Sequence, residues 1–323
     1  MEENVFIKLE HISKTFPGVK ALDNIRLTNK PGAVQALVGE NGAGKATLIK
    51  VLAGNYKPDE GGRIMIDGET FDSLTPRLSL HKGIVVIYQD FSLFPNLSVA
   101  ENISITEEME KKGVCVNWNE MRTIAQKALE RLGVDIDVNV QLGTLSTAKQ
   151  QLVAIARALA CDAKLIIMDE PTTALELTIQ AQILDLIRDL NQEMNTSVVF
   201  ITHDLGVVSE LCDTVIVMYN GHIVEKAPTT DIFREPLHPY TQGLLSAIPR
   251  ITKERKPLST IEGMVPNPVE RIKGCRFWPR CPKACDRCRK EEPPVFSVGE
   301  DRQVRCWLYA QADNGSQEAV TNG

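Results

Sequence analysis

A glycine-rich stretch, Gly39 to Thr47 (GENGAGKAT), is the feature that most limits what this chain can fold into. The apolar run Ala36 to Val38 comes before it and is typical of a buried strand, and the apolar-periodic run Leu48 to Leu52 after it predicts a helix. A strand, a glycine loop and a helix form the context of a phosphate-binding loop, because backbone N–H groups and the helix start surround phosphate oxygens. The sequence therefore predicts an α/β fold around a nucleotide.

Lys45 supplies the full positive charge that such a loop places on the β- and γ-phosphates. The next position normally holds a Ser or Thr that binds Mg²⁺, but here it is Ala46, and Thr47 comes one residue late. We expect nucleotide to bind and the metal to be held more weakly, by roughly 1–3 kcal/mol if one charge-assisted contact is lost. The candidate nucleotide-binding residues of the loop are Gly39, Glu40, Asn41, Gly42, Ala43, Gly44, Lys45, Ala46 and Thr47.

Bulk properties exclude several classes of protein. The 323 residues leave room for two domains, and the net charge of -6 with a pI near 5.5 argues against nucleic acid as a partner. No run approaches the roughly 18 apolar residues of a membrane span, and the acidic N-terminus lacks the pattern of a signal peptide. We expect a cytosolic chain that serves a membrane only through a partner.

Polar residues follow three further apolar strands. Gln89 comes after Ile84 to Tyr88, Asp169 and Glu170 end the run that starts at Leu165, and His203 follows Val198 to Thr202. Ligands bind at the carboxyl ends of parallel strands, so these side chains are candidates for one site. Asp169 suits Mg²⁺, Glu170 is placed to polarise a water, and His203 is interpreted as functional rather than structural.

The segment Asp90 to Thr147 is dominated by helical patterns, notably Trp118 to Leu132, and predicts a helical insertion in the α/β core. Ser146 is a good N-cap for the helix that follows, and that helix start could also bind an anion. Phe16 is either a core residue or an aromatic that stacks on adenine. Asn220 and Gly221 predict a type I′ hairpin turn.

Together these pieces resemble the ATP-binding subunit of an ATP-binding cassette (ABC) transporter. The resemblance rests on GENGAGKAT, Gln89, LSTAKQQ, LIIMDEPTTAL and ITHD, in that order. It implies a P-loop NTPase with a RecA-like core, an antiparallel β subdomain and a helical insertion, in which two domains sandwich two ATP molecules. It further implies that Lys45 and its loop hold phosphates, that Glu170 is the general base, and that His203 contacts the γ-phosphate. Gln89 and Asp169 would serve Mg²⁺ and the attacking water.

The same resemblance implies that Ser146 reaches the ATP of the opposite subunit and that Phe16 stacks on adenine. Two motifs depart from the family. Thr147, Ala148 and Lys149 stand where Gly, Gly and Gln are usual, and the loop 173–176 ends in Glu instead of Asp. Together with Ala46, these departures concern the rate of turnover rather than the fold.

The two parts of the chain resemble different branches. Residues 1–175 are similar to monosaccharide importers, and residues 176–323 are similar to dipeptide, oligopeptide and nickel importers, so the chain is interpreted as a possible hybrid. We expect a nucleotide-binding domain at 1–235, with its helical subdomain at about 90–160, and an extension at 236–323. A linker is expected from Arg250 to Pro268.

In the peptide branch, such an extension carries four cysteines that resemble iron–sulfur ligands. The matching residues are Cys275, Cys281, Cys288 and Cys306, with Cys285 as an extra. Thiolates suit an iron–sulfur cluster or zinc, and unligated thiols are the alternative. Nearby Arg and Lys residues could suggest nucleic acid, but the interleaved cysteines favour a metal site.

The sequence therefore predicts the ATP-hydrolysing subunit of an importer that uses ATP and Mg²⁺. The preferred substrates are dipeptides, oligopeptides or nickel. Its partners would be a second ATPase subunit, two membrane permeases at whose cytoplasmic face it sits, and, indirectly, an extracytoplasmic solute-binding protein. Three alternatives stay open: a monosaccharide importer ATPase, a soluble ABC-type switch in DNA repair or translation, and a subunit that binds ATP without hydrolysing it.

Overall fold

The computed structural model describes residues 5–90, 92–110, 116–171, 177–247, 261–264, 266, 269–270, 272–299 and 301–310. The expected loop 173–176 and most of the expected linker, Arg250 to Pro268, lie outside these ranges. Among the helices that are described, none combines the length and the apolar character needed to cross a bilayer.

The largest sheet in the described part of the chain has eight strands, in the order β11-β12-β10-β9-β3-β8-β7-β6. Its five strands from β9 to β6 run parallel, and the pairs that involve β10, β11 and β12 are antiparallel. The strand bounds are β3 Val34–Val38, β6 Ile84–Ile87, β7 Leu165–Asp169, β8 Ser197–Ile201, β9 Thr214–Tyr219, β10 His222–Pro228, β11 Phe296–Ser297 and β12 Gln303–Val304.

Strands β3 and β8 are buried along their whole length, which explains why they read as continuous apolar runs and not as alternating ones. Their side chains still alternate between two cores. Ala36 of β3 belongs to the core on one face of the sheet and Leu37 to the core on the other. The predicted buried strands around the phosphate loop are therefore confirmed.

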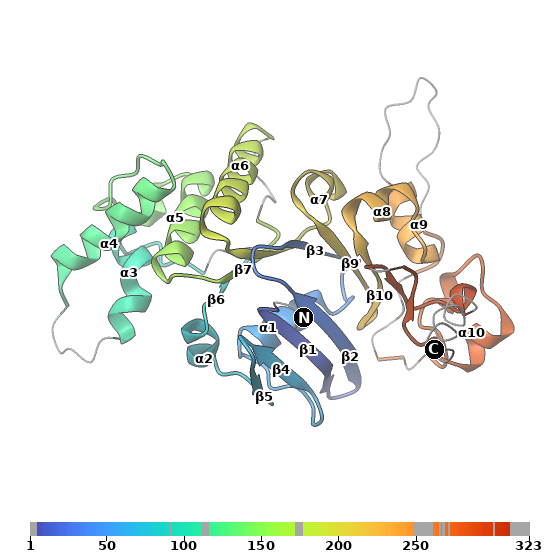
Figure 1. Cartoon of the computed structure of the whole chain (residues 1–323). Helices are drawn as coiled ribbons and strands as arrows, with labels where there is room; N and C mark the ends of the chain where they lie inside the picture. The colour runs from blue at the N-terminus through green and yellow to red at the C-terminus, as the bar shows by residue number, and fades with distance from the viewer. Residues whose placement is uncertain are drawn as a thin grey trace, which may run out of the picture.

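Helices cover the first face of this sheet, and their apolar residues join the same core as Ala36. Figure 1 shows them above the sheet in its view. They are α5 Thr147–Ala160, α6 Leu177–Met194, α7 Leu205–Leu211, α8 Thr229–Arg234 and α9 Pro239–Ser246. The turn between β9 and β10 has positive φ at Asn220 (43°) and Gly221 (79°), which confirms the predicted hairpin turn.

The opposite face is covered by α1 Lys45–Leu52 and by an antiparallel sheet in the order β2-β1-β4-β5. Figure 1 shows α1 beside this sheet. The predicted antiparallel subdomain is thus present. Its elements are β1 Ile7–Phe16, β2 Val19–Asn29, β4 Arg63–Ile66 and β5 Glu69–Phe71, followed by α2 Pro76–His81.

The predicted helical insertion is also present, and it projects from the end of the sheet next to β6 (Figure 1). It contains α3 Val99–Glu110 and α4 Trp118–Arg131, which pack on α5. Met121, Ala125 and Leu129 of α4 are buried, as the helical period of the sequence requires. The apolar face expected between Trp118 and Leu132 is therefore the face that packs.

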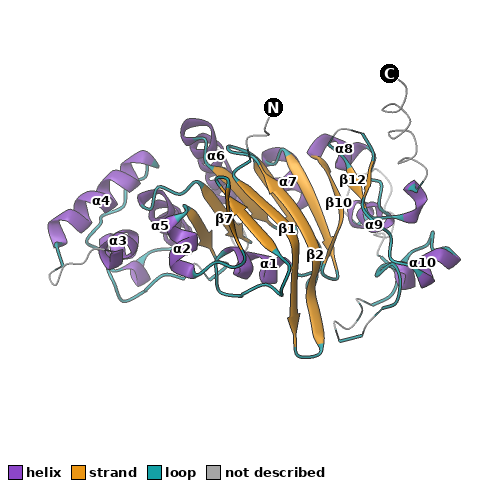
Figure 2. Cartoon of the chain, turned by 60° about the horizontal axis from the view of Figure 1, so that its bottom comes forward, coloured by secondary structure: helices purple, strands orange, loops and turns teal. Residues whose placement is uncertain are grey.

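The C-terminal region continues the main sheet instead of standing apart from it. Strand β12 pairs with β10, with Val304 opposite Glu225, and Figure 2 shows the two strands side by side. The short helix α10 Asp286–Lys290 lies further out, at the edge of the molecule (Figure 2). The ladder between β10 and β12 therefore attaches this region to the nucleotide-binding part of the chain, and β11 extends the sheet from β12.

Candidate functional site

A cleft of about 500 Å³ opens where β3, β6 and β7 end. It brings together residues that lie more than two hundred positions apart in the chain, from Phe16 to Asn220. They are Phe16, Val19, Lys20, Ala21, Asn41, Gly42, Ala43, Gly44, Lys45, Ala46, Thr47, Gln89, Asp169, Glu170 and Asn220. Most of the residues predicted from the sequence to bind nucleotide or metal therefore face one space.

The loop before α1 depends on two glycines. Gly39 has φ of 154°, and a Cβ atom there would lie 2.3 Å from the carbonyl oxygen of Met218. Gly44, the N-cap of α1, has φ of 105°, and its Cβ would lie 2.7 Å from the carbonyl oxygen of Ala21. Both positions exclude a side chain, so the loop can follow its path only with glycine.

Lys45 folds back across this loop. Its Nζ donates to the carbonyl oxygens of Gly39, at 2.5 Å, and Glu40, at 3.2 Å. Burial lowers the pKa of Lys45, and the carboxylates of Glu170 and Asp169 oppose that shift. The ammonium group is thus held at the loop with two acids nearby, an arrangement that can bind phosphate oxygens together with a divalent metal.

Asp169 and Glu170 stand at the end of β7, and burial, followed by the charge of Glu170, raises the pKa of Asp169. A buried carboxyl group such as Asp169, whose ionisation is opposed by burial and by a neighbouring carboxylate, is suited to bind a cation. Glu170 takes the left-handed conformation (φ 51°), and its N–H donates to the carbonyl oxygen of Ile201 on β8. This turn directs the second acid away from the path of the strand.

His203, just after β8, reaches Glu170. The His203 Nδ1 lies 2.9 Å from Glu170 Oε2, and the side chain of His203 is 75% exposed while that of Glu170 is 19% exposed. The pairing follows from strand order, because β7 and β8 are neighbours and both end at this edge. A histidine so exposed can contact a ligand in the cleft and still orient the carboxylate.

Three other predicted residues differ in their placement. Phe16 lines the cleft, with its ring 5.2 Å from that of Tyr56 in an edge-on contact. Ala46 presents only a methyl group there. Ser146 caps α5, accepting from the Lys149 N–H at 3.5 Å, and is not among the residues that line this cleft.

The cysteines of the C-terminal region form a second site. A cavity of about 60 Å³ is lined by all five of them, together with Phe277, Trp278 and Trp307. The extra cysteine is part of this group, since Cys285 Sγ lies 3.4 Å from Cys288 Sγ. Burial raises the pKa of Cys275 to about 12 and that of Cys306 to about 11. Cys288 and Cys306 are buried, Cys275 and Cys281 are half-buried, and Cys285 is exposed. Buried thiols need a positive partner to ionise, and sulfur is a ligand type that soft metals and iron–sulfur clusters accept.

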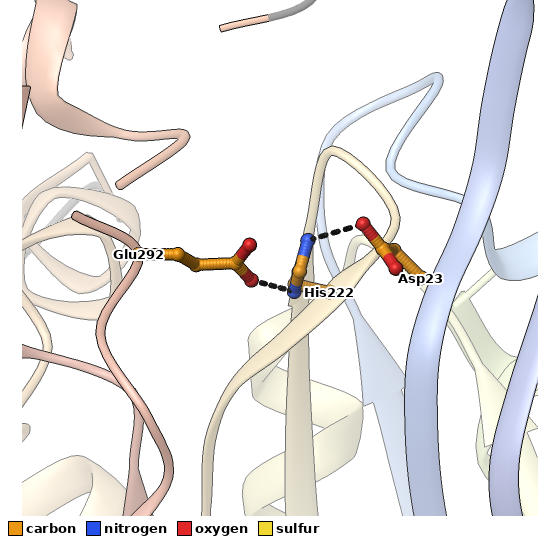
Figure 3. Close-up of side chains that lie close together, drawn as sticks. All are labelled: Asp23, His222 and Glu292. Carbon is orange, nitrogen blue, oxygen red and sulfur yellow. Dashed lines mark ion pairs between the residues drawn. The ribbon is translucent and has the colours of Figure 1, made fainter. Parts of the chain in front are cut away.

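A third group combines Asp23, His222 and Glu292 (Figure 3). The buried His222 ring lies between the acids, with Nδ1 3.1 Å from Glu292 Oε1 and Nε2 3.5 Å from Asp23 Oδ2. One ligand atom from each of the three residues lies within 4.8 Å of the others, so the group has the spacing of a possible metal site. Each carboxylate is nevertheless already engaged by an arginine. Arg276 pairs with Asp23 and Arg305 with Glu292, which makes the group an ion-pair network between the two parts of the chain.

Sequence reasoning missed Val19, Lys20 and Ala21, which line the cleft beside Phe16, and it also missed two residues that the fold brings in from further away. Asn220, predicted only as a turn residue, lines the cleft, and the Tyr240 hydroxyl accepts from the Glu40 N–H at 2.8 Å. Neither carries a local signal, since each reaches the loop only through the pairing of distant strands and helices.

Comparisons with known proteins agree with this geometry. Residues 22–173 match a family model described as ABC transporter, and residues 224–288 match one described as oligopeptide/dipeptide transporter, C-terminal region. The chain is 41% identical to the oligopeptide transport ATP-binding protein AppD of Bacillus subtilis, over 91% of this chain and 92% of that protein. It is 37% identical to the dipeptide transport ATP-binding protein DppD of Escherichia coli, over 89% and 90%. Both alignments therefore span the two parts of the chain.

Solved structures give the same answer for the fold. The ADP conformation of MJ1267, an ATP-binding cassette of an ABC transporter, superposes with a TM-score of 0.64 at 28% identity, over 72% of this chain and 96% of that one. A dimeric post-hydrolysis state of the cassette MJ0796, bound to ADP and Pi, gives 0.62 at 29% identity, over 69% and 98%.

Proposed function

Because the chain belongs to the ATP-binding proteins of ABC transporters, in the group that carries the oligopeptide/dipeptide C-terminal region, we propose that its ATPase activity drives the uptake of dipeptides or oligopeptides. The single observation that carries the choice of substrate is the match of the C-terminal region, since the cassette alone is shared by importers of many solutes. Nickel ions remain a second substrate for the same test.

The residues of the cleft divide the chemistry among them. Lys45 and the N–H groups of its loop bind the phosphates, and Asp169 with Gln89 holds Mg²⁺. Glu170 accepts a proton from the attacking water, and His203, in contact with its carboxylate, orients it and reaches the γ-phosphate. The Glu170 side chain is mostly shielded from solvent, and this burial holds its carboxylate in a defined position.

A second ATPase subunit completes the site. Ser146 and the start of α5 lie outside the cleft of their own chain, so their contact with ATP requires the opposite subunit. The dimeric state of the similar cassette MJ0796 supports this arrangement. Two membrane permeases would hold the pair at the cytoplasmic face, and an extracytoplasmic binding protein would deliver the peptide.

The helical insertion is the proposed contact with the permease. Its surface leaves Phe94 50% exposed and Trp118 53% exposed, and Gln89 joins this region to the cleft. Exposed aromatic side chains of this size are typical of protein interfaces. Binding of ATP in the cleft would thus change the position of Gln89, next to the surface of the helical insertion that contacts the permease.

The five thiols of the small cavity would hold an iron–sulfur cluster or zinc, with Cys275, Cys281, Cys288 and Cys306 as the proposed ligands. Cys285 is the alternative candidate for one ligand position, because its sulfur lies 3.4 Å from that of Cys288. A bound metal would supply the positive charge that these buried thiolates lack. Anaerobic purification followed by visible absorption and metal analysis separates a brown cluster from colourless zinc, and Cys285→Ser identifies the fourth ligand.

Uptake of labelled solutes by cells tests the function. A strain that lacks the gene is complemented with the wild-type chain or with Glu170→Gln, and the uptake of a labelled dipeptide, a labelled oligopeptide, radioactive nickel and a monosaccharide is compared. We expect peptide uptake to return with the wild-type chain and not with Glu170→Gln. Restoration of monosaccharide or nickel uptake alone would overturn the choice of substrate, and full rescue by Glu170→Gln would point to a subunit that only binds ATP.

A further inference from the structure

The cysteine-rich region sends two arginines into the nucleotide-binding part of the chain. Both belong to the short segment between Cys275 and Cys281. The Arg276 guanidinium donates to the Asn220 carbonyl oxygen and to the Asp23 carboxylate. Arg280, four residues later, reaches the phosphate-binding loop itself. The segment therefore contacts both Asn220, which lines the proposed nucleotide cleft, and Glu40 of the phosphate-binding loop.

Arg280 forms a two-pronged ion pair with Glu40. Its Nη1 lies 2.7 Å from Glu40 Oε2 and its Nη2 lies 3.1 Å from Glu40 Oε1. The Arg280 side chain is 5% exposed and that of Glu40 is 25% exposed. The hydrogen bonds to Glu40 raise the pKa of Arg280, so the pair stays charged. Forked, shielded arginine–carboxylate pairs fix orientation as well as charge.

The other end of Arg280 is equally constrained. Its Nε donates to the Glu262 carbonyl oxygen at 3.2 Å. Phe277, on the same segment, is 2% exposed and packs against the rings of Tyr219 and Tyr240, at centroid distances of 5.1 and 5.4 Å. The backbone of the segment that carries Arg280 is therefore held in place, and a movement of this segment would be transmitted to Glu40.

Glu40 in turn shapes the loop that binds phosphate. Its carbonyl oxygen accepts from Lys45 Nζ at 3.2 Å and from the Ala43 N–H at 3.1 Å, while its own N–H donates to the Tyr240 hydroxyl at 2.8 Å. Glu40, the partner of Arg280, thus also accepts a hydrogen bond from Lys45 and closes the first turn of the loop through Ala43.

We propose that Arg280 is a positioning residue for ATP binding, acting through Glu40 to hold the phosphate-binding loop in its working shape. The nucleotide site is then incomplete without the C-terminal region. The segment that carries Arg280 lies between Cys275 and Cys281, two cysteines of the thiol cavity. The state of those thiols would reach the ATPase site through this one side chain. The inference rests on the proposed nucleotide cleft.

Binding of the fluorescent analogue mant-ATP to the purified full-length chain tests it. Arg280→Met is expected to weaken binding about 10-fold or more, the effect of losing hydrogen bonds to a charged group, and to raise KM more than it lowers kcat. Arg280→Lys keeps the charge without the fork, so binding should fall between that of Arg280→Met and that of wild type. The matched control is Arg188→Met, which removes an exposed arginine–aspartate pair on α6, with Asp185 at 2.9 Å, and should leave binding unchanged.

A double-mutant cycle gives the decisive readout. If Arg280 acts through Glu40, adding Glu40→Gln to Arg280→Met should weaken mant-ATP binding no further than Arg280→Met alone. Losses that multiply in the double variant, or an Arg280→Met chain that melts like wild type and binds within about twofold of it, would overturn the proposal. If Arg280→Met does not fold, Glu40→Gln and Arg280→Lys decide the question, since wild-type binding in both refutes it. Failure of the wild-type chain to bind mant-ATP would instead refute the nucleotide cleft.

Discussion

Replacing Ala46 by serine tests how this cleft holds its metal. Ala46 is the second residue of α1 and lines the same space as Asp169 and Gln89. In the usual phosphate-binding loop, a hydroxyl at this position binds Mg²⁺. The methyl group here has no oxygen to offer, so a water must take that coordination place. Ala46→Ser adds the missing oxygen without changing the length of the loop.

The size of the effect follows from one coordination contact. A hydrogen bond or contact to a charged group contributes roughly 1–3 kcal/mol, and a substituting water recovers part of it. Each 1.4 kcal/mol corresponds to about a factor of ten, so the Mg²⁺ concentration for half-maximal activity should fall about 5- to 150-fold in Ala46→Ser. Asp169 and Gln89 are present in both proteins, and their contribution cancels in the comparison.

Phosphate release at a fixed ATP concentration, titrated with free Mg²⁺, measures this shift. Ala46→Cys is the matched control, because its thiol has nearly the shape of the serine hydroxyl but is a poor ligand for Mg²⁺. It should behave like the wild-type chain with Mg²⁺. Thr47→Val removes the neighbouring hydroxyl, which also lines the cleft, and is expected to leave the Mg²⁺ dependence unchanged.

Equal Mg²⁺ dependence in Ala46→Ser and the wild-type chain would refute the reasoning. If Thr47→Val alone weakened the response to Mg²⁺, the late hydroxyl would be the ligand, and the loop would have to hold the metal one residue further along α1 than its sequence pattern implies.

Three further outcomes can be checked separately. Glu170→Gln should lower the rate of phosphate release about 10²- to 10⁴-fold, the usual contribution of a general base, while equilibrium dialysis shows ATP still bound; near-normal release would exclude this role. Burial lowers the pKa of His238 from 6.5 to about 3, so below pH 6.5 the unfolded chain takes up a proton that the native chain refuses. The free energy of unfolding should therefore decrease as the pH is lowered, by up to about 1.4 kcal/mol per pH unit. The variant His238→Asn keeps an acceptor for the Tyr240 N–H and should reduce this pH dependence, measured by urea titrations at pH 7 and pH 5. The same pH dependence in both proteins would show that His238 is not responsible. Phe200→Ala, at a fully buried position of β8, should cost about 3–5 kcal/mol of unfolding free energy, and a loss well below that range in a urea titration would mean that the core can collapse around the gap.

The nucleotide cleft could be predicted from the sequence because its signals are local. Lys45 follows the glycines that its loop requires, and Asp169, Glu170 and His203 each end an apolar strand. Since parallel strands that read as buried place their carboxyl ends at one edge, the convergence of these residues follows from pattern alone. The structure confirms that convergence for the two acids and Lys45, and it places His203 against Glu170.

The attachment of the C-terminal region could not be predicted in the same way. Arg280 and Glu40 are 240 residues apart, and the pairing of β12 with β10 depends on a ladder of only two residue pairs. No periodicity or spacing in the sequence encodes such contacts. From the sequence alone, the arginines among the cysteines could suggest nucleic acid, whereas in the structure two of them form ion pairs with the cassette. Cysteine spacing likewise could not show that Cys285 lines the same cavity as the other four.

Photolabelling with azido-ATP, followed by mass spectrometry of the labelled peptides, tests the central claim most directly. The account predicts that the label falls on the peptide that contains Phe16 and Val19, at the adenine end of the cleft. Mg²⁺ should support this labelling, unlabelled ATP should compete with it, and Lys45→Ala should abolish it. Labelling that is concentrated elsewhere on the chain, or that persists unchanged in Lys45→Ala, would contradict the assignment of this cleft as the site where ATP is bound and hydrolysed.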